Sequence, residues 1–333
     1  MAVLEVRDLR VHYRTSKGRA KAVDGVSFEI EEGEYLGLVG ESGCGKSTIA
    51  KAILKILPPN GEIVGGSILY RGQDLTSMQP REMKKIQWKE ISMIPQSAMN
   101  SFDPVYRIED QLREVIEAHT PMPEQAIKGK IEQLFGLVGL NTNRLKDFPH
   151  QFSGGMRQRA MIAMSLVLDP HLIVADEPTT GLDVIVQDQI LFRIKEIHEL
   201  MKKTMLLITH HMAIVAENCQ KIAVMYAGKI MEYGGKSVFL NPYHPYTLGL
   251  INAFPNLDDD ERELISIPGS PPNLLSPPQG CRFHERCPFR TDRCIQEEPP
   301  LRSVGEQQFS ACHYPDQVDR FRSAAMKPET WSA

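Results

Sequence analysis

A stretch of nine residues near the N-terminus has the residue types that hold a chain of phosphates. Its glycines permit a tight turn in which successive backbone N–H groups converge on phosphate oxygens. A lysine supplies a cation for the outer phosphates, the next serine offers a hydroxyl to Mg²⁺, and a threonine supports the start of the following helix. The stretch matches G-x-x-x-x-G-K-[ST] in full and consists of Gly40, Glu41, Ser42, Gly43, Cys44, Gly45, Lys46, Ser47 and Thr48. We therefore predict a phosphate site here, in which Cys44 fills a variable position and needs no role of its own.

A pair of acidic residues follows a second apolar run much later in the chain. Asp176 and Glu177 come directly after residues 172–175, which have the pattern of a buried strand. An acidic side chain at the end of such a strand is placed to hold Mg²⁺, directly or through water. We assign that role to Asp176, and to Glu177 the role of general base for an attacking water. The alternative is that two exposed acids start a turn at Pro178. The presence of the phosphate loop makes this alternative less favoured.

Short apolar runs predict the strands that position both groups. Residues 35–40, just before the loop, are nearly all apolar, which is typical of a strand buried on both faces of a parallel sheet. A helix is predicted at residues 46–57, where prolines stop it. The pattern as a whole predicts an α/β fold. The other predicted strands lie at residues 4–11, 23–30, 172–175, 205–209 and 221–226.

Two parts of the chain depart from this strand pattern. Residues 98–168 show helical periodicity broken by prolines, so a helical insertion interrupts the sheet, which then resumes. Beyond residue 235 proline and glycine become frequent, and four of the six cysteines gather there. We predict a nucleotide-binding core at residues 1–97 and 169–235, a helical subdomain at 98–168, and a small, loop-rich C-terminal extension at 236–333.

A run in the helical part resembles the signature motif of ABC ATPases. Residues 152–158 read F-S-G-G-M-R-Q and lie upstream of the Asp176–Glu177 pair, as in that family. The resemblance covers residues 1–240 and is specific, because six motifs occur in the family's order. It implies a P-loop NTPase fold of the RecA-like type that hydrolyses ATP with Mg²⁺. The remaining matches are Tyr13, which would stack on adenine; the Q-loop residue Gln96, a catalytic residue that joins Ser47 and Asp176 around Mg²⁺; the D-loop residue Asp183; and the switch histidine His210, which would contact the γ-phosphate and orient the water.

The signature residues also have a physical interpretation. Ser153, Gly154 and Gly155 precede a helix and leave its first backbone N–H groups free, which makes an anion site. By resemblance, this helix tip meets the ATP held by a second subunit, so that ATP joins two domains and hydrolysis releases them. Met156 replaces the glutamine common in the motif, and His211 replaces an aspartate that often follows the switch histidine. Neither change removes a group that hydrolysis needs.

Further runs resemble one branch of that family, the subunits of dipeptide and oligopeptide importers. They lie at residues 149–159, 241–247 and 268–272. The branch implies a second, different ATP-binding subunit, two transmembrane permeases and, indirectly, an extracytoplasmic substrate-binding protein. One permease helix would dock in a groove near residues 96–103. Some relatives carry nickel or oligosaccharides, so those cargoes, and a non-transport ATPase, remain alternatives.

The apolar content of the chain indicates where it works. The apolar run at residues 161–168 is far shorter than the about 20 residues that cross a bilayer. The N-terminus lacks the basic start and apolar core of a signal peptide. Together with the resemblance, this predicts a peripheral protein on the cytoplasmic face of the cell membrane.

Four cysteines in a short, proline-rich segment have the chemistry of a metal site. Cys281, Cys287, Cys294 and Cys312 supply four thiolates, which suit Zn²⁺ or an iron–sulfur cluster. Structural zinc usually shows tighter cysteine pairs, so the wide spacing favours a [4Fe–4S] cluster, which similar tails of the peptide-importer family can carry. Zn²⁺ and unligated thiols remain open. A cluster would staple a segment too small to build its own core.

The charge balance argues against a nucleic-acid partner. The chain has 38 basic and 42 acidic side chains, for a formal net charge of −4. A local row of arginines alternates with the cysteines and with acids, and we interpret it as a solvated face. Its members are Arg282, Arg286, Arg290 and Arg293.

Overall fold

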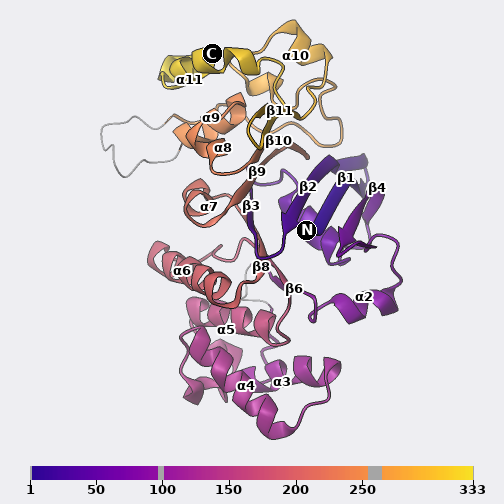
Figure 1. Ribbon diagram of the computed structural model, residues 1–333, viewed down its shortest axis with the longest axis vertical. Helices are drawn as coiled ribbons and strands as arrows, with labels where there is room; N and C mark the ends of the chain where they lie inside the picture. The colour runs from indigo at the N-terminus through magenta and orange to yellow at the C-terminus, as the bar shows by residue number, and fades with distance from the viewer. Residues whose placement is uncertain (1, 97–100, 254–264, 333) are drawn as a thin grey trace. The chain divides into compact units, whose positions relative to one another are not determined.

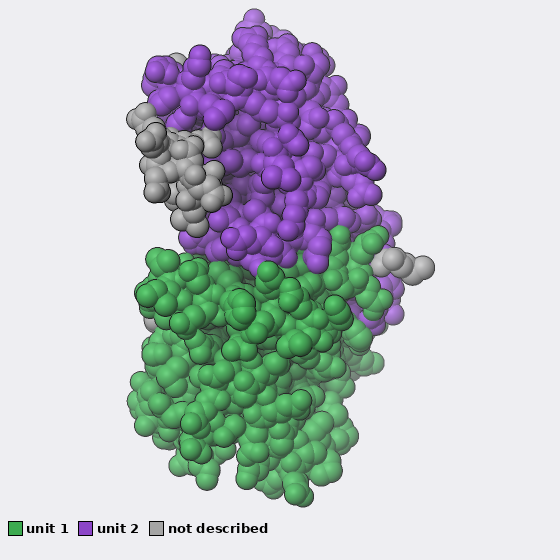
Figure 2. All heavy atoms as spheres, turned by 60° about the vertical axis from the view of Figure 1, so that its left-hand side comes forward, with its two compact units in different colours: residues 1, 31–35, 77–208 green, residues 2–30, 36–76, 209–333 purple. Residues whose placement is uncertain are grey.

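The computed structural model describes residues 2–96, 101–253 and 265–332 (Figure 1). The chain divides into two compact units, drawn in green and purple in Figure 2. Unit 1 contains residues 31–35 and 77–208, and unit 2 contains residues 2–30, 36–76 and 209–333. None of the helices in the described ranges has the length and apolarity that a bilayer crossing requires.

Unit 1 combines a few parallel strands with most of the long helices. Its strands run parallel in the order β8–β7–β6, and β7 and β8 are buried along their whole length. Strands covered on both faces read as continuous apolar runs. Helix α5 packs against β6 and against α3, α4 and α6. The bounds are β6 (Ile91–Ile94), β7 (Leu172–Asp176), β8 (Thr204–Thr209), α2 (Pro80–Ile86), α3 (Ile108–His119), α4 (Glu124–Leu137), η2 (Thr142–Arg144), η3 (Pro149–Gln151), α5 (Gly154–Leu166) and α6 (Val184–Met201).

Unit 2 begins with an antiparallel sheet of order β2–β1–β4–β5. Strands β1 and β4 pair from Leu4 opposite Tyr70 to Tyr13 opposite Gly61. The last residues of β2 alternate between buried and exposed, which is the pattern of a sheet with one covered face. The bounds are β1 (Ala2–Thr15), β2 (Gly18–Glu31), β4 (Gly61–Tyr70) and β5 (Gln73–Asp74).

A second set of strands in unit 2 has the order β11–β12–β10–β9–β3. Only β3 and β9 run parallel; the other neighbours are antiparallel. The C-terminal elements of Figure 1 follow β10. The bounds are β3 (Tyr35–Val39), β9 (Lys221–Tyr226), β10 (Lys229–Gly234), β11 (Arg302–Gly305), β12 (Gln308–Ser310), α1 (Lys46–Ile53), α7 (Met212–Asn218), α8 (Ser237–Leu240), α9 (Pro245–Asn252), η4 (His284–Arg286), α10 (Asp292–Gln296), η5 (Pro315–Gln317), α11 (Val318–Ala325) and α12 (Pro328–Trp331).

All six predicted strands are confirmed within a few residues, whereas the predicted first helix is too long. Helix α1 ends at Ile53 rather than at residue 57. The reason is Lys55, whose φ of +56° is left-handed and cannot continue an α-helix. Its ammonium group donates to the carbonyl of Thr76, 2.9 Å away, which holds the turn in place.

Candidate nucleotide site and cysteine-lined cavity

The phosphate loop lies between β3 and α1 in unit 2, and different structural requirements call for glycine at its different positions. Gly40 and Gly45 have φ of +151° and +107°, and a Cβ on them would lie only 2.0 and 2.1 Å from the backbone oxygens of Met225 and Ala22. Gly43 also has a positive φ, of +79°, but no atom lies within 4 Å of its virtual Cβ. The first two glycines thus let the loop fit against its neighbours, and Gly43 serves the backbone turn alone.

Lys46 is held by the loop itself. Its ammonium group donates to the carbonyls of Gly40 and Glu41 at 2.8 and 3.0 Å and approaches the Cys44 sulfur at 3.7 Å. The side chain is buried, with 4% of Lys46 exposed. Cys44 therefore has a contact that the sequence did not suggest, and burial raises the pKa of its thiol. Ser42 and Gly43 are exposed at the tip of the loop.

Two more predicted nucleotide residues lie beside the loop in unit 2. The hydroxyl groups of Tyr13 and Thr48 are 3.3 Å apart, which joins β1 to the first turn of α1. The ring of Tyr13 also lies against Gly61, where a Cβ would come within 2.8 Å of it. Ser47 occupies the same first turn. The stacking of Tyr13 on adenine and the Mg²⁺ contact of Ser47 stay predictions.

The acidic pair lies in unit 1, at the end of β7. Asp176 is buried, and Glu177 has a left-handed φ of +45°, a strained conformation for a residue with a side chain. Its backbone N–H donates to Ile208, 2.8 Å away, which fixes that conformation. The carboxylate oxygen Oε2 accepts hydrogen bonds from Gln96 Nε2 at 3.0 Å and from Thr180 Oγ1 at 2.9 Å.

These contacts bring together two residues that the sequence assigned to one reaction, and they add a third. Gln96 and Glu177 are 81 positions apart, yet their side chains touch. Thr180 was not predicted, although a hydroxyl three residues after the base is a usual position for a local side-chain hydrogen bond. A carboxylate oriented by two donors is suited to accept a proton from a positioned water.

The signature residues form the start of α5 in unit 1. Ser153 is the N-cap, and its hydroxyl accepts from the N–H of Met156 at 3.3 Å. The helix then begins with Gly154 and Gly155, so no side chain at these two positions obstructs their backbone N–H groups. Such a helix tip is suited to an anion. The next helix, α6, begins nearby, because a Cβ on Gly155 would lie 2.6 Å from Val186 Cγ1.

We expect Gly155→Ala to lower the stability of unit 1. The added methyl group collides with a β-branched side chain that has little rotamer freedom, and overpacking of this kind costs about 1–3 kcal/mol. The thermal unfolding midpoint should fall by several degrees and recover in the double variant Gly155→Ala/Val186→Ala. The matched control is Gly129→Ala in α4, where nothing lies within 4 Å. A midpoint equal to that of the control would show that the close approach of α5 and α6 is unimportant.

The structure places the D-loop and switch residues at element ends. Asp183 is the N-cap of α6, and its side chain accepts from the N–H of Val186 at 3.0 Å. In unit 2, the rings of His210 and His211 lie 4.3 Å apart, directly before α7. Unit 1 thus holds the acidic pair, Gln96, the signature and Asp183, and unit 2 holds the phosphate loop, Tyr13 and His210. Their meeting around one nucleotide stays a prediction.

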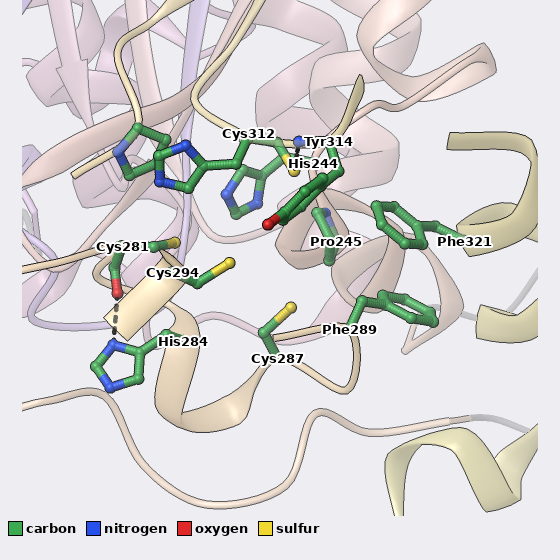
Figure 3. Close-up of a pocket in the computed structure, with 12 residues that line it drawn as sticks. His244, Pro245, Cys281, His284, Cys287, Phe289, Cys294, Cys312, Tyr314 and Phe321 are labelled. Carbon is green, nitrogen blue, oxygen red and sulfur yellow. Dashed lines mark hydrogen bonds between the residues drawn. The ribbon is translucent and has the colours of Figure 1, made fainter. Parts of the chain in front are cut away.

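The four cysteines of the tail line one cavity in unit 2 (Figure 3). About 340 Å³ of the space there holds no atoms, part of it open to solvent. The close-up shows the sulfurs of Cys281, Cys287 and Cys294 directed toward a shared space. Within the described ranges, no three His, Cys, Asp or Glu side chains are placed to hold a single metal ion. The structure therefore does not show the metal site that the sequence predicted, although it gathers the predicted ligands.

The surroundings of these thiols are apolar but rich in backbone donors. Burial, followed by the neighbouring thiols, raises the pKa of Cys281 to about 12, and burial raises that of Cys312 to about 11 and that of Cys287 well above its usual value. Backbone N–H groups act in the opposite direction, such as that of Tyr314, which donates to the Cys312 sulfur at 3.5 Å. Gly280 permits the approach of the two sides of the cavity, since its Cβ would lie 2.2 Å from the Cys294 oxygen.

The interpretation of the tail arginines as a solvated face is wrong for two of the four. Arg282 is buried and pairs with Asp24 of β2, and the side chain of Arg286 is only 6% exposed and pairs with Glu41 of the phosphate loop. Only Arg290 and Arg293 are exposed. The partners lie about 250 positions away in the sequence, at separations of 258 and 245, so local composition could not reveal them.

Comparisons with known proteins agree with these motifs. Residues 23–180 match the family described as "ABC transporter", and residues 231–294 match "Oligopeptide/dipeptide transporter, C-terminal region". The dipeptide transport ATP-binding protein DppD of Caldanaerobacter subterraneus is 41% identical, over 93% of this chain and 96% of the relative. The oligopeptide transport ATP-binding protein OppD of Salmonella typhimurium is 44% identical, over 94% of each chain.

Solved structures resemble the fold at lower identity. The ATP-binding cassette MJ0796, in a dimeric post-hydrolysis state with ADP and Pi, superimposes with a TM-score of 0.63 at 22% identity. The match covers 70% of this chain and 98% of that one, and it shows a shared ABC ATPase fold. Taken with the near-full-length similarity to DppD and OppD, these findings show that the chain belongs to the ABC transporter family of ATPases, in the branch that carries the oligopeptide/dipeptide transporter C-terminal region.

Proposed function

We propose that this chain hydrolyses ATP to power the import of dipeptides or oligopeptides through a membrane transporter. One observation carries the proposal: relatives named as dipeptide and oligopeptide transport ATP-binding proteins align over more than nine-tenths of both chains. Nickel or oligosaccharide import, or a non-transport role, has no comparable support.

The residues of this chain divide the work of hydrolysis. The phosphate loop and Lys46 bind the phosphates, and His210 contacts the γ-phosphate. The Glu177 carboxylate, held by Gln96 and Thr180, accepts the proton of the attacking water. Mg²⁺ would neutralise phosphate charge, with Ser47, Gln96 and Asp176 as the residues that hold it. Asp176 suits this role because it offers a carboxylate at a buried strand end, and oxygen ligands are those Mg²⁺ prefers.

The signature and D-loop are the parts that need a second subunit. The α5 tip, with Ser153, Gly154 and Gly155, offers its N–H groups to the ATP of the partner, and Asp183 lies at the same junction. We propose a different ATP-binding subunit as that partner. The pair would bind two transmembrane permeases, and a substrate-binding protein would act through the permeases. The chain would then be peripheral on the cytoplasmic face of the membrane.

The proposed permease contact falls partly on residues the structure does not describe. Of residues 96–103, positions 97–100 lie outside the described residues. Gln96 and Asp103 lie on either side of them, and the N–H of Asp103 donates to Gln111 Oε1, 2.9 Å away. Here the proposal rests on the family resemblance.

We further propose that the cysteine-lined cavity holds a [4Fe–4S] cluster, with Zn²⁺ as the alternative. Four thiols line the cavity, and backbone N–H groups donate to the sulfurs of Cys281, Cys287 and Cys312. Four thiolates are the ligands of such a cluster, and hydrogen bonds to sulfur are typical of these sites. The cluster would supply a covalent staple across the segment that contains Cys281, Cys287, Cys294 and Cys312.

We expect Cys287→Ser to abolish iron binding and to loosen the tail. The change replaces a soft thiolate ligand by a hydroxyl group, which binds iron poorly. A segment with little hydrophobic core depends on the cluster for its stability. Iron and acid-labile sulfide are measured in protein purified without oxygen, together with the absorbance near 400 nm. Cys219→Ser is the matched control, because Cys219 is buried away from the cavity residues. Stoichiometric zinc without iron in the wild-type protein would favour the alternative.

Reconstitution tests the transport proposal directly. The chain is purified with its permeases and partner ATPase, placed in vesicles, and supplied with ATP, binding protein and labelled dipeptides or oligopeptides. We expect uptake that needs ATP and that stops with Glu177→Gln. Uptake of Ni²⁺ or of oligosaccharides, with none of peptides, would overturn the cargo; turnover that no membrane partner changes would point to the non-transport role.

A further inference from the structure

The second residue of the phosphate loop is bound to the cysteine segment (residues 281–294) by a bidentate ion pair. Arg286 Nη1 lies 2.6 Å from Glu41 Oε2, and Arg286 Nη2 lies 2.9 Å from Glu41 Oε1. The same guanidinium donates to the Tyr226 hydroxyl at 3.2 Å and lies over its ring. Its Nε donates to the carbonyl of Pro268 at 2.7 Å. Such a fork fixes both the position and the orientation of the carboxylate.

The backbone of Glu41 is fixed by the C-terminal part of the chain as well. Its N–H donates to the hydroxyl of Tyr246 in α9, 3.0 Å away. The rings of Tyr246, Tyr226 and Phe283 pack with centroids 4.6 to 5.3 Å apart, and Phe283 itself belongs to the cysteine segment. All three rings are almost fully buried. This packing leaves the loop entrance little freedom to shift by itself.

Glu41 is also one of the residues that hold the ammonium group of Lys46. The Lys46 ammonium group donates to the carbonyls of Gly40 and Glu41. A continuous chain of contacts therefore runs from Cys287 through its neighbour Arg286 to Glu41 and then to Lys46. Every member of this chain lies in unit 2.

We propose that Arg286 is a positioning residue for ATP binding, and that the cysteine segment sets the affinity of the phosphate loop for ATP through it. A segment held in order by its four cysteines keeps Arg286 on Glu41 and Lys46 in register with the phosphates. When the segment loosens, Glu41 is released and ATP binds less tightly. The inference rests on the proposed ATP binding but not on the proposed cargo.

The first test compares ATP affinity in two arginine variants of the same segment. Arg286→Ala should weaken the binding of a fluorescent ATP analogue with Mg²⁺ by about tenfold, which is within the range usual for coupled sites. Arg293→Ala, which removes an arginine that is exposed to solvent and paired with Glu297, should bind as the wild type does. Arg286→Lys should recover only part of the loss, since an ammonium cannot make the fork.

The kinetic readout separates positioning from a general loss of structure. Because Arg286 acts on a loop that holds ATP in the ground and transition states alike, KM for ATP should rise while kcat stays near the wild-type value. Tyr246→Phe removes only the hydroxyl that receives the Glu41 N–H and should move KM in the same direction. Wild-type affinity, measured first, tests the nucleotide site itself. Equal KM for Arg286→Ala and Arg293→Ala would overturn the inference.

A cycle of combined variants tests the route through Arg286. Glu41→Gln should add little to Arg286→Ala, since both break one contact. Cys287→Ser should weaken ATP binding in the wild-type background but have no further effect in the Arg286→Ala background. Additive losses in either pair would show that the cysteine segment acts on ATP by another route or not at all, and would reject the proposal.

Discussion

Replacing Glu177 by glutamine is expected to leave ATP binding intact and to lower ATP turnover by at least about a hundredfold, the usual contribution of a positioned general base. Glutamine keeps the size of the side chain and an oxygen that accepts the Thr180 hydroxyl, but it cannot take a proton from water. Gln96 and Thr180 donate to the same oxygen, Oε2, so a glutamine whose amide oxygen takes that position keeps both hydrogen bonds. The loss therefore falls on the chemical step and not on affinity.

The backbone conformation at position 177 is expected to be the same in the wild type and the variant. Glutamine retains a Cβ, so the left-handed φ of +45° and its strain are the same in both proteins, and the hydrogen bond from the backbone N–H to Ile208 remains. Single-turnover rates with bound ATP, measured beside equilibrium affinity, isolate hydrolysis. Glu199→Gln on the exposed side of α6 is the matched control and should behave as the wild type. Wild-type turnover in the Glu177 variant would mean that another group is the base.

Local patterns predicted the parts of the site that depend on neighbours in the chain. The phosphate loop needs glycines, a cation and a helix start within nine residues, so its sequence nearly determines its geometry. The same holds for the strand before Asp176, since a strand buried on both faces must be continuously apolar. Strand β10 was not predicted, although it is largely buried, because Glu232 interrupts its apolar pattern.

Glu232 shows why such an interruption is hard to interpret from sequence. Its carboxylate is fully buried and accepts hydrogen bonds from the N–H groups of Tyr243 and His244 and from Gln308. Burial nevertheless dominates and raises the pKa of Glu232 to about 7. A charged residue in a strand is predicted to be exposed unless its hydrogen-bond donors are known. The donors to Glu232 come from positions 11 to 76 residues away.

Two contacts of the site that escaped prediction are long-range. Gln96 was assigned by resemblance and Glu177 from its place after an apolar strand, but their hydrogen bond depends on β6 and β7 being neighbours. The sequence predicts that Arg286, like the other tail arginines, is exposed to solvent, and only the fold brings it to Glu41. Because an ion pair has no periodicity and no spacing rule, composition alone gives the same signal for a solvated arginine and a buried one.

The second large effect is expected from Lys46→Ala, which should weaken MgATP binding by about a hundredfold or more. A hydrogen bond from a charged donor is worth about 1.5–3 kcal/mol, and this ammonium group would serve two phosphates. The substitution also removes the donor that the Gly40 and Glu41 carbonyls share, so the loop loses its internal support. Affinity measured by titration of a fluorescent ATP analogue with Mg²⁺ gives the size of the effect. Lys51→Ala, in the last turn of the same helix, is the matched control.

The comparison of Lys46→Ala with Arg286→Ala separates removal of the cation from its displacement. If Arg286 acts by positioning, its loss leaves the ammonium group in the site but less well placed, so the affinity of Arg286→Ala should fall between those of the wild type and Lys46→Ala. Lys46→Arg should bind ATP poorly too, because a planar guanidinium cannot replace a compact ammonium group between the Gly40 and Glu41 carbonyls. Wild-type affinity in Lys46→Ala would show that the phosphate loop does not bind ATP. Arg286 could then have no effect on ATP binding through that loop.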